Sequence, residues 1–296
     1  MKLNEQIKIA FFGNSEFSFL VLEEMKKNGI TPDLIVTTKD KPQGRKMIFT
    51  PTQTKVWAEN NSVEYVEPEK LKDESFIKKI SEYDLFIVAS YGKIIPKVVI
   101  DIPKYKVLNI HPSLLPKYRG PSPLQEQILN DEKEVGVSIM LIDEQVDHGN
   151  IIVQKKVEIK DWPIGFNLLQ ETLAKEGAKL LSEIILDWVK NKIESKEQKH
   201  DEATFTKKVE KIDGFLDLSS NSYKNYLKFL AFEEWPKTYF EIEKKVENTD
   251  NKTIEQKKIR VIIKKATYKD NNFEILSVIP EGKKEMDYKS FLNGLK

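Results

Sequence analysis

Short apolar runs alternate with amphipathic segments along the first 190 residues of the chain. Four segments space their apolar residues as one face of a helix, and they span residues 15–29, 54–61, 74–83 and 166–191. The apolar runs that we predict as buried strands are 7–13, 33–39, 63–66, 84–90 and 106–110. Strands that alternate with helices favour an α/β domain built on a mainly parallel sheet. Two further strands, 135–143 and 150–159, are predicted to pair around a short loop.

The pattern changes after Asn191. Residues 191–206 are charged and poor in apolar side chains, which predicts a linker. Beyond it, the pattern predicts a helix at 222–234 and strands at 238–243, 258–268 and 273–279. We therefore predict an N-terminal domain over residues 1–190, a linker over 191–206 and a small β-rich C-terminal domain over 207–296.

Composition narrows the possible function classes. The chain has 296 residues and a net charge of +1, so its overall charge does not predict binding to nucleic acid or to a membrane. It has no cysteine, which excludes disulfides and thiolate nucleophiles and fits a reducing cytosol. No apolar stretch predicts a signal peptide or a membrane span. The sequence has neither a G-x-G-x-x-G motif nor a P-loop, which disfavours nicotinamide, flavin and nucleotide-triphosphate binding.

Two loops that follow predicted strands collect polar side chains able to do chemistry. In open α/β sheets, sites gather where the carboxyl ends of strands meet loops. Together the two loops offer Asn109, His111, Ser113, Arg119, Asp143, Glu144, Asp147 and His148. An amide and a charged imidazole can stabilise the oxyanion that forms during addition to a carbonyl, and a nearby carboxylate favours the charged imidazole. Such a site needs no nucleophile from the protein when the substrate is an amine.

Each of these residues also has a simpler interpretation. Asn109 and His111 can be a turn cap and a satisfied histidine, and Asp147 before a glycine-containing turn can be a turn residue. His148 and His200 lie in polar segments, where solvated side chains are the usual case. No histidine pair has the spacing of metal ligands, so we expect no metal. The spacing of these residues alone does not distinguish a catalytic site from such structural roles.

Three segments resemble the signature of the folate-dependent formyltransferases. "NIHPSLLPKYRGPSP" (109–123) is similar to the family pattern Asn-x-His-x-Ser-Leu-Leu-Pro followed by Arg-Gly. "VASYGKIIP" (88–96) resembles the family's Ala-x-Tyr-Gly-x-x-Leu-Pro segment, with Ser90 and Ile95 as mild departures. "LIDEQVDHGNII" (141–152) resembles the family's Asp-x-Gly loop. Three such segments in order and at similar spacing are more specific than any one of them.

The resemblance extends over nearly the whole chain to the methionyl-tRNA formyltransferases. It covers "FFGNSEFSFLVLEEM" (11–25) and the following segment to Asp73. It continues in "ATFTKKVEKIDGFLDL" (203–218) and ends in "ILSVIPEGKKEMDYKSFLNG" (275–294). Because small-substrate relatives lack or replace this C-terminal domain, the full-length match favours a tRNA substrate.

The resemblance implies that the formyl group of 10-formyltetrahydrofolate is transferred to the α-amino group of methionine on charged initiator tRNA. The implied fold is a Rossmann-like formyltransferase domain followed by a tRNA-binding domain that is OB-like. The segment "KDNN" (269–272) joins two predicted strands almost directly, so this second domain is expected to be trimmed. The implied location is the cytoplasm, and the implied state is a monomer.

The resemblance also implies roles for individual residues. Asn109 and His111 would stabilise the tetrahedral oxyanion, and Asp147 would keep His111 protonated and relay protons through water. The implied folate-binding residues are Ser90, Tyr91, Gly92, Ser113, Leu114, Leu115 and Pro116. The rest of "VASYGKIIP" and the loop before Asp147 are implied to line the same site. Arg45 and Lys46 would contact the tRNA acceptor stem, although a solvated basic loop is the plain alternative for them.

Three other functions remain open at this point. The runner-up is a formyltransferase acting on an amino-sugar nucleotide or another small amine through the same Asn, His and Asp. A formyltetrahydrofolate hydrolase would replace the amine by water. A catalytically idle RNA-binding protein would have no need for Asn109, His111 and Asp147 together.

Overall fold

The computed structural model describes residues 7–43, 47–247 and 254–295. They form two compact units, each described here by itself. The first unit runs to Pro123 and adds Glu134–Lys160 and Leu169–Lys207; the second comprises Leu124–Lys133, Asp161–Leu168 and the chain from Lys208 onward. Among the described residues, no helix is long and apolar enough to cross a membrane.

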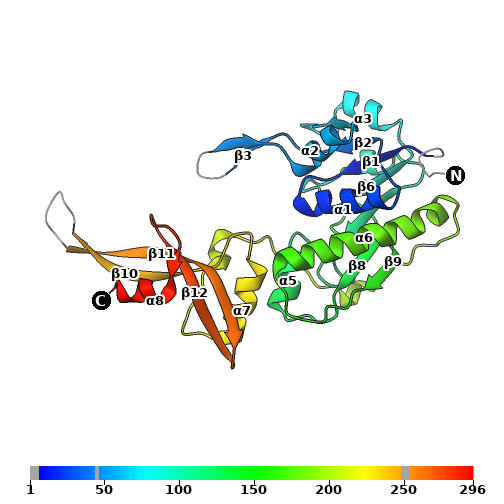
Figure 1. The fold of residues 1–296 in the computed structure, drawn as a ribbon. Coiled ribbons are helices and arrows are strands. Elements are labelled where there is room, and N and C mark those ends of the chain that lie inside the picture. Colours follow the sequence, from blue (N-terminus) through cyan, green and yellow to red (C-terminus); the bar gives the residue numbers. More distant parts are fainter. Residues whose placement is uncertain (1–6, 44–46, 248–253, 296) are drawn as a thin grey trace. The chain divides into compact units, whose positions relative to one another are not determined.

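A mostly parallel sheet forms the centre of the first unit (Figure 1). Its seven strands, counted over the described residues, lie in the order β5 (Glu64–Val66), β2 (Leu34–Val36), β1 (Ile9–Phe12), β6 (Leu85–Val88), β7 (Val107–His111), β8 (Gly136–Leu141) and β9 (Ile151–Lys156). The first five strands run parallel, whereas β8 and β9 are antiparallel to their neighbours. The predicted mainly parallel α/β sheet is confirmed, as is the paired arrangement of β8 and β9.

Helices cover both faces of this sheet because its strands are apolar on both sides. The helices of the unit are α1 (Glu16–Lys27), α2 (Gln53–Asn60), α3 (Glu74–Ile80), α4 (Lys97–Ile100) and most of α6 (Phe166–Val189). On one face, Phe76 and Ile80 of α3 share a buried cluster with Phe12 of β1. On the other face, a Cβ at Gly177 of α6 would lie 2.6 Å from Ile110, so this helix packs its backbone against β7. Tight packing of α6 thus fixes the strand that carries Asn109 and His111.

Residues 41–50 include two short strands that the sequence analysis did not predict. These strands form a hairpin of β3 (Lys41–Gln43) and β4 (Ile48–Thr50). Met47, Ile48 and Phe49 are exposed there. The polar composition of "KPQGRKM" gave no indication of strands. Strands pair through backbone N–H and C=O groups, and composition describes only side chains. The predicted tRNA-contacting residues Arg45 and Lys46 lie outside the described residues.

Residues 191–206 also differ from expectation, because they are not a free linker. Lys196 exchanges two backbone hydrogen bonds with Ile151, at 2.7 and 2.8 Å. Arg119 donates its backbone N–H to Thr204 and accepts one from Thr206. We call residues 196–206, which include a 3₁₀ turn at His200–Glu202, the strap. Its polar composition suits a surface segment, yet its hydrogen bonds attach it to the first unit.

The second unit contains an antiparallel sheet, which confirms the predicted β-rich structure of the C-terminal part. Its described strands form an antiparallel meander of β10 (Tyr239–Glu247), β11 (Ile254–Lys269), β12 (Asn272–Pro280) and β13 (Met286–Asp287). It also includes most of α5 (Pro123–Leu129), a 3₁₀ turn (Lys211–Gly214), α7 (Ser222–Ala231) and α8 (Tyr288–Asn293). Asp270 and Asn271 turn β11 directly into β12 with positive φ angles, the usual geometry of a two-residue hairpin. These four described strands are fewer than the five of an OB barrel.

Candidate active site

Strand β7 places Asn109 and His111 side by side at the carboxyl end of the parallel sheet. The two residues are two positions apart, so both side chains leave the same face of the strand. Both are buried, with exposed fractions of 8% and 4%. The strand is held on both sides, by β6 in parallel and by β8 in antiparallel register. This pairing fixes the two polar groups where sequence analysis expected them.

The loop between β8 and β9 brings Asp147 to the same place. Its Oδ1 atom lies 3.4 Å from Asn109 Nδ2 and 3.6 Å from His111 Nδ1. Its Oδ2 atom accepts a 2.8 Å hydrogen bond from the backbone N–H of Gly120. Asp147 has a φ of 49°, a left-handed conformation in which Asp is among the less unfavourable residues. The three residues predicted from the sequence therefore meet in the fold.

The second ring nitrogen of His111 also faces an acceptor. His111 Nε2 lies 3.0 Å from the carbonyl oxygen of Tyr118. A carbonyl can only accept, so this nitrogen carries a hydrogen. His111 Nδ1 then faces the carboxylate of Asp147. Each nitrogen of the His111 ring therefore faces an oxygen acceptor.

The predicted Ser113–Pro116 segment serves chiefly to shape the loop after β7. Ser113 is fully buried, and its hydroxyl donates a 2.7 Å hydrogen bond to the carbonyl of Lys117. Leu115 is also buried and donates its backbone N–H to Ser138. Leu114 packs where a Cβ at Gly136 would lie. These contacts hold the path of the chain from His111 to Tyr118.

The other predicted folate residues form a turn after β6. Ser90 and Gly92 both have positive φ angles. Tyr91 between them is buried and meets the Phe12 ring edge-on at 5.5 Å. Burial raises the pKa of the Tyr91 phenol, and its hydroxyl has no hydrogen-bond partner among the described residues. The tyrosine therefore lies in the apolar core beneath the turn.

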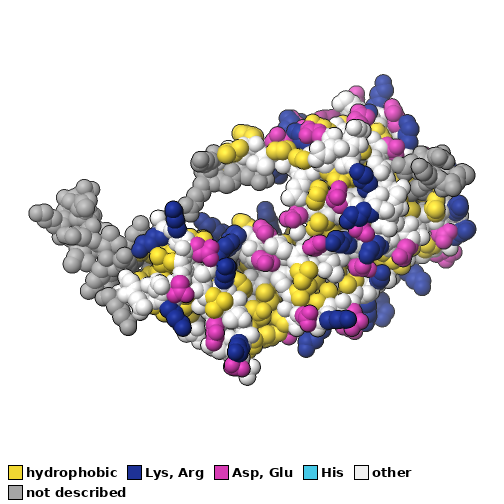
Figure 2. Space-filling model, viewed as in Figure 1, with side chains coloured by type: hydrophobic (Ala, Val, Ile, Leu, Met, Phe, Trp, Pro, Cys, Tyr) yellow, Lys and Arg dark blue, Asp and Glu magenta, His cyan; other side chains and the backbone are white. Residues whose placement is uncertain are grey.

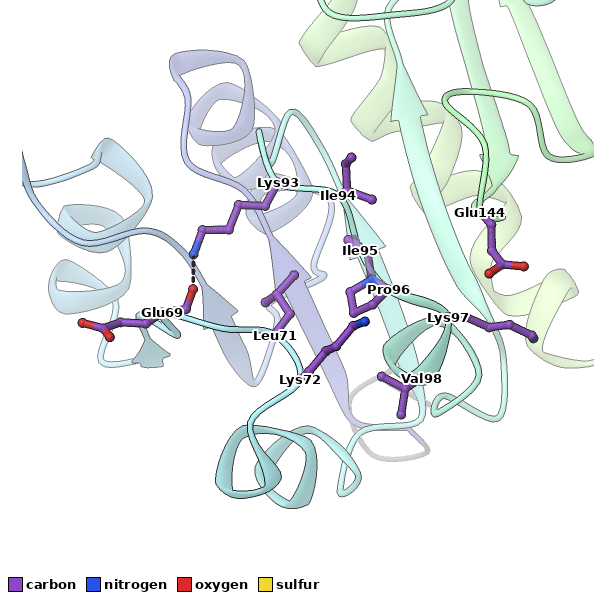
Figure 3. A pocket seen from close by; sticks show the side chains of 10 residues that line it. All are labelled: Glu69, Leu71, Lys72, Lys93, Ile94, Ile95, Pro96, Lys97, Val98 and Glu144. Carbon is purple, nitrogen blue, oxygen red and sulfur yellow. Dashed lines mark hydrogen bonds between the residues drawn. The ribbon is translucent and has the colours of Figure 1, made fainter.

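A cavity of about 700 Å³ opens next to this turn (Figure 3). Its lining consists of an apolar strip and several charged side chains, namely Glu69, Leu71, Lys72, Lys93, Ile94, Ile95, Pro96, Lys97, Val98 and Glu144. Ile94 is 84% exposed although it is apolar. Lys93 donates hydrogen bonds to the backbone carbonyls of Pro68 and Glu69. Lys93–Pro96 belong to the "VASYGKIIP" segment and Glu144 to the loop before Asp147, both of which the family resemblance implied for folate binding. Leu71 and Lys72 come from an earlier segment for which the sequence gave no such signal.

Gln198 is a further residue at this site that the sequence did not indicate. Its side-chain amide donates hydrogen bonds to the backbone carbonyls of Asp147 and Gly149, at 2.9 and 2.7 Å. Its amide oxygen accepts two from the buried guanidinium of Arg119, at 3.1 and 2.7 Å. His200 of the strap stacks on His148 with ring centroids 4.1 Å apart. Because residues 191–206 were predicted to be a linker, we did not expect any of these contacts.

Replacement of Gly149 by alanine is expected to lower the stability of the protein. An ideal Cβ there would lie 2.1 Å from the carbonyl oxygen of Leu141, so the turn after Asp147 has to move. We expect a loss of roughly 1–3 kcal/mol in the free energy of unfolding, measured by urea denaturation. Gly294→Ala is the matched control, because a Cβ there meets its nearest atom at 3.5 Å. Equal stability of the two variants would contradict the expectation.

The arrangement is chemically suited to addition of an amine to a carbonyl. Asn109 supplies a neutral donor, His111 a ring with an acceptor at each nitrogen, and Asp147 a carboxylate that lies close to both. Within the part of the chain that the structure describes, no group of three His, Asp or Glu side chains could hold a metal ion.

Comparison with known proteins decides the family. Residues 7–185 match the formyl transferase family model. The chain is 36% identical over 299 residues to the methionyl-tRNA formyltransferase of Campylobacter lari, covering 97% of this chain and 96% of that protein. The chain belongs to the methionyl-tRNA formyltransferase family. The resemblance stated from sequence motifs is thereby confirmed.

Solved structures of formyltransferases share the fold of this family member. The methionyl-tRNA formyltransferase from Clostridium thermocellum superposes with a TM-score of 0.58 at 14% identity, covering 95% of this chain and 99% of that one. A 4-N formyltransferase from Francisella tularensis gives a TM-score of 0.60 at 20% identity, covering 85% of this chain and 96% of that one. At these identities the likeness concerns the fold alone, and the acceptor has to be argued from other observations.

Proposed function

We propose that this formyltransferase moves the formyl group of 10-formyltetrahydrofolate to the α-amino group of methionine on charged initiator tRNA. The observation that carries the proposal is the 36% identity to a methionyl-tRNA formyltransferase over 97% of this chain, a match that includes the second unit. The meeting of Asn109, His111 and Asp147 supports the same chemistry. The proposed substrate puts the reaction in the cytoplasm, where translation begins, and a monomer stays a prediction.

The proposed reaction begins when the amine nitrogen attacks the formyl carbon. The carbonyl oxygen then gains negative charge, and Asn109 Nδ2 and the ring of His111 donate hydrogen bonds to it. Asp147 favours the charged ring and accepts a proton from the attacking amine through water. The bond from the formyl carbon to the folate nitrogen breaks, and that nitrogen takes up the proton. No covalent bond to the protein is required, because the folate already carries the activated carbon.

The cavity beside the Ser90–Gly92 turn is the proposed folate site. A folate has a flat heteroaromatic system and an anionic glutamate tail. The apolar strip from Ile94 to Val98 offers contact area for the flat part, and Lys72, Lys93 and Lys97 lie near enough to attract the anionic tail. Ser113–Pro116 do not line this cavity, so their predicted contact with folate stays a prediction.

Ile94→Ala is expected to raise the dissociation constant for the folate about tenfold while leaving stability unchanged, since covering this side chain contributes about 1.5 kcal/mol. The Ile94 side chain is mostly exposed in the unbound protein, so its loss removes little packing from the fold. Binding of folinic acid by calorimetry and the melting temperature measure the two effects. Ile212→Ala is the matched control, since Ile212 is also exposed but lies in the second unit. A weaker folate complex for both variants alike would count against the site.

The proposed tRNA partner is expected to bind through local charge. On the face seen in Figure 2, basic and acidic side chains are interspersed. A net charge of +1 likewise gives no strong global attraction for a polyanion. Contact by Arg45 and Lys46 stays a prediction. We therefore expect tRNA affinity to depend on a small number of phosphate contacts and to fall with salt.

An acceptor comparison tests the proposed function directly. The protein is incubated with 10-formyltetrahydrofolate and with methionine-charged initiator tRNA, uncharged tRNA, a nucleotide-linked amino sugar or no acceptor. Formylmethionyl-tRNA formed only with the charged tRNA is the expected result. Transfer to the amino sugar would move the function to a small-amine formyltransferase, and deformylation without an acceptor would indicate a hydrolase. No reaction in any tube would favour an RNA-binding protein without activity.

A further inference from the structure

The strap crosses the two loops that carry the partners of His111. At one end, Lys196 pairs with Ile151, just beyond the Asp147 loop. At the other end, Phe205 pairs with Arg119 in the loop after β7. The strap therefore ties together two loops that lie about 30 residues apart in the sequence and that both contribute to the candidate site.

Gln198 joins the strap to the Asp147 turn, and chemistry fixes the orientation of its amide. A guanidinium can only donate hydrogen bonds, so the oxygen of Gln198 must face Arg119. The NH₂ group must then face the carbonyls of Asp147 and Gly149, which can only accept. Gln198 and Arg119 are both buried, with exposed fractions of 4% and 3%. The Gln198 amide thus joins Arg119, through its oxygen, to the Asp147 turn, through its NH₂ group.

The charge of Arg119 strengthens this link. A charged donor on the amide oxygen polarises the amide, which makes its NH₂ group a better donor to Asp147 and Gly149. Burial lowers the pKa of the Arg119 guanidinium, and the carboxylates of Asp147 and Asp143 oppose that change. The adjacent Gly120 N–H donates to the Asp147 carboxylate itself. The Arg119 region therefore holds Asp147 at both its backbone and its side chain.

The strap also positions the second partner of His111. Thr204 accepts a 2.8 Å hydrogen bond from the backbone N–H of Tyr118 through its hydroxyl. The carbonyl of Tyr118 is the group that faces His111 Nε2. The Thr206 hydroxyl accepts from the N–H of Ser122 in the same loop. Both acceptors around the His111 ring are consequently set by groups on the strap.

We propose that the strap is a positioning element of the transfer site, in which Gln198, braced by Arg119, holds Asp147 against His111. The inference rests on the proposed function and assigns to residues 196–206 a role in it. Gln198 does not contact the reacting atoms; it acts through Asp147. Substitution of Gln198 should therefore have little effect on kcat when the carboxylate of Asp147 has already been removed.

The test is Gln198→Glu. The new carboxylate still accepts from Arg119, but it has no hydrogen to donate to the carbonyls of Asp147 and Gly149. We expect kcat for formyl transfer to fall roughly 10- to 100-fold because the carboxylate of Asp147 is displaced. The KM for the folate should stay within about twofold of its original value, since a positioning defect acts on the transition state. Gln53→Glu, which adds the same charge at an exposed position of α2, should leave kcat unchanged.

A double-mutant cycle separates positioning from a general structural role. In an Asp147→Asn background, Gln198→Glu should change kcat by no more than about twofold, because both changes disable one unit. If the fold-loss in kcat of the double variant equals the product of the two single losses, the proposal is overturned. Hydrogen exchange followed by mass spectrometry gives a readout without activity. Peptides covering 118–122 and 147–149 should exchange about tenfold faster in Gln198→Glu, whereas peptides of β1 and β6 should not change.

The exchange measurement also keeps the two proposals distinguishable. If the unaltered protein forms no formylmethionyl-tRNA, the proposed function fails, and the exchange rates alone decide whether the strap holds the Asp147 turn. Unchanged exchange of residues 147–149 in Gln198→Glu would overturn the positioning role even in an active enzyme.

Discussion

Replacement of His111 by glutamine is expected to lower kcat for formyl transfer by roughly 100- to 10,000-fold while leaving the protein folded. The glutamine amide can still donate a hydrogen bond to the carbonyl of Tyr118, so the buried loop keeps a partner there. It carries no charge, however, and it cannot relay a proton. The ring is 4% exposed and faces an acceptor at each nitrogen, so the fold holds it in one orientation beside Asp147. Single-turnover formylation of charged tRNA measures the loss directly.

The His111 experiment needs a control for folding and for substrate binding. Folinic acid affinity and the melting temperature of His111→Gln should remain close to those of the unaltered protein. His200→Gln is the comparison variant for the strap, because His200 lies there with its Nδ1 2.9 Å from Arg119 Nη2 and, among the described residues, makes no hydrogen bond to His111 or Asp147. Near-normal turnover of His111→Gln would contradict the mechanism, and a large loss in both variants would point to the strap rather than to the ring.

Replacement of Asp147 by asparagine is expected to lower kcat by roughly 100- to 10,000-fold, the range found when a carboxylate that orients a histidine is neutralised. Asparagine has nearly the same shape, and its oxygen can still accept from the Gly120 N–H. It removes the negative charge that lies 3.6 Å from His111 Nδ1 and the base that accepts the amine proton. The change tests charge rather than shape.

Two measurements qualify the Asp147 result. The KM for the folate should change little, because the carboxylate acts on the developing charge rather than on the bound folate. Asp143→Asn is the matched control, since Asp143 lies in the same loop and pairs with His148 instead of His111. Equal losses of kcat in the two variants would mean that the loop tolerates no substitution, and the specific role of Asp147 would be wrong.

Much of the first unit could be predicted from local patterns. The β1, β6 and β7 strands are short apolar runs, and α1 and α6 place apolar residues at helical spacing. The side-by-side placement of Asn109 and His111 also follows from the two-residue period of a strand. Asp147, from a different loop, could be brought to them only through the rule that strand ends gather sites, together with the family resemblance.

Other features were beyond the reach of local patterns. The β3–β4 hairpin and the strap both depend on backbone pairing, within residues 41–50 for the hairpin and with distant loops for the strap. Composition describes side chains, so it cannot tell a polar segment that is paired from one that is solvated. For the same reason Gln198 had no signal in the sequence. Its role depends on a guanidinium 79 residues earlier in the chain.

The sequence by itself determined the α/β class, the strand that carries Asn109 and His111, and, through its motifs, the formyltransferase family. Those properties depend on periodicity and on short stretches of chain, where neighbouring residues dictate the outcome. Only the tertiary structure decided which groups face the His111 ring, that Tyr118 offers a carbonyl and Asp147 a carboxylate, and that Gln198 and Arg119 hold the turn between them. Hydrogen bonds between distant segments depend on distances of a few ångströms, and those distances exist only after the sheet, the loops and the strap have packed together.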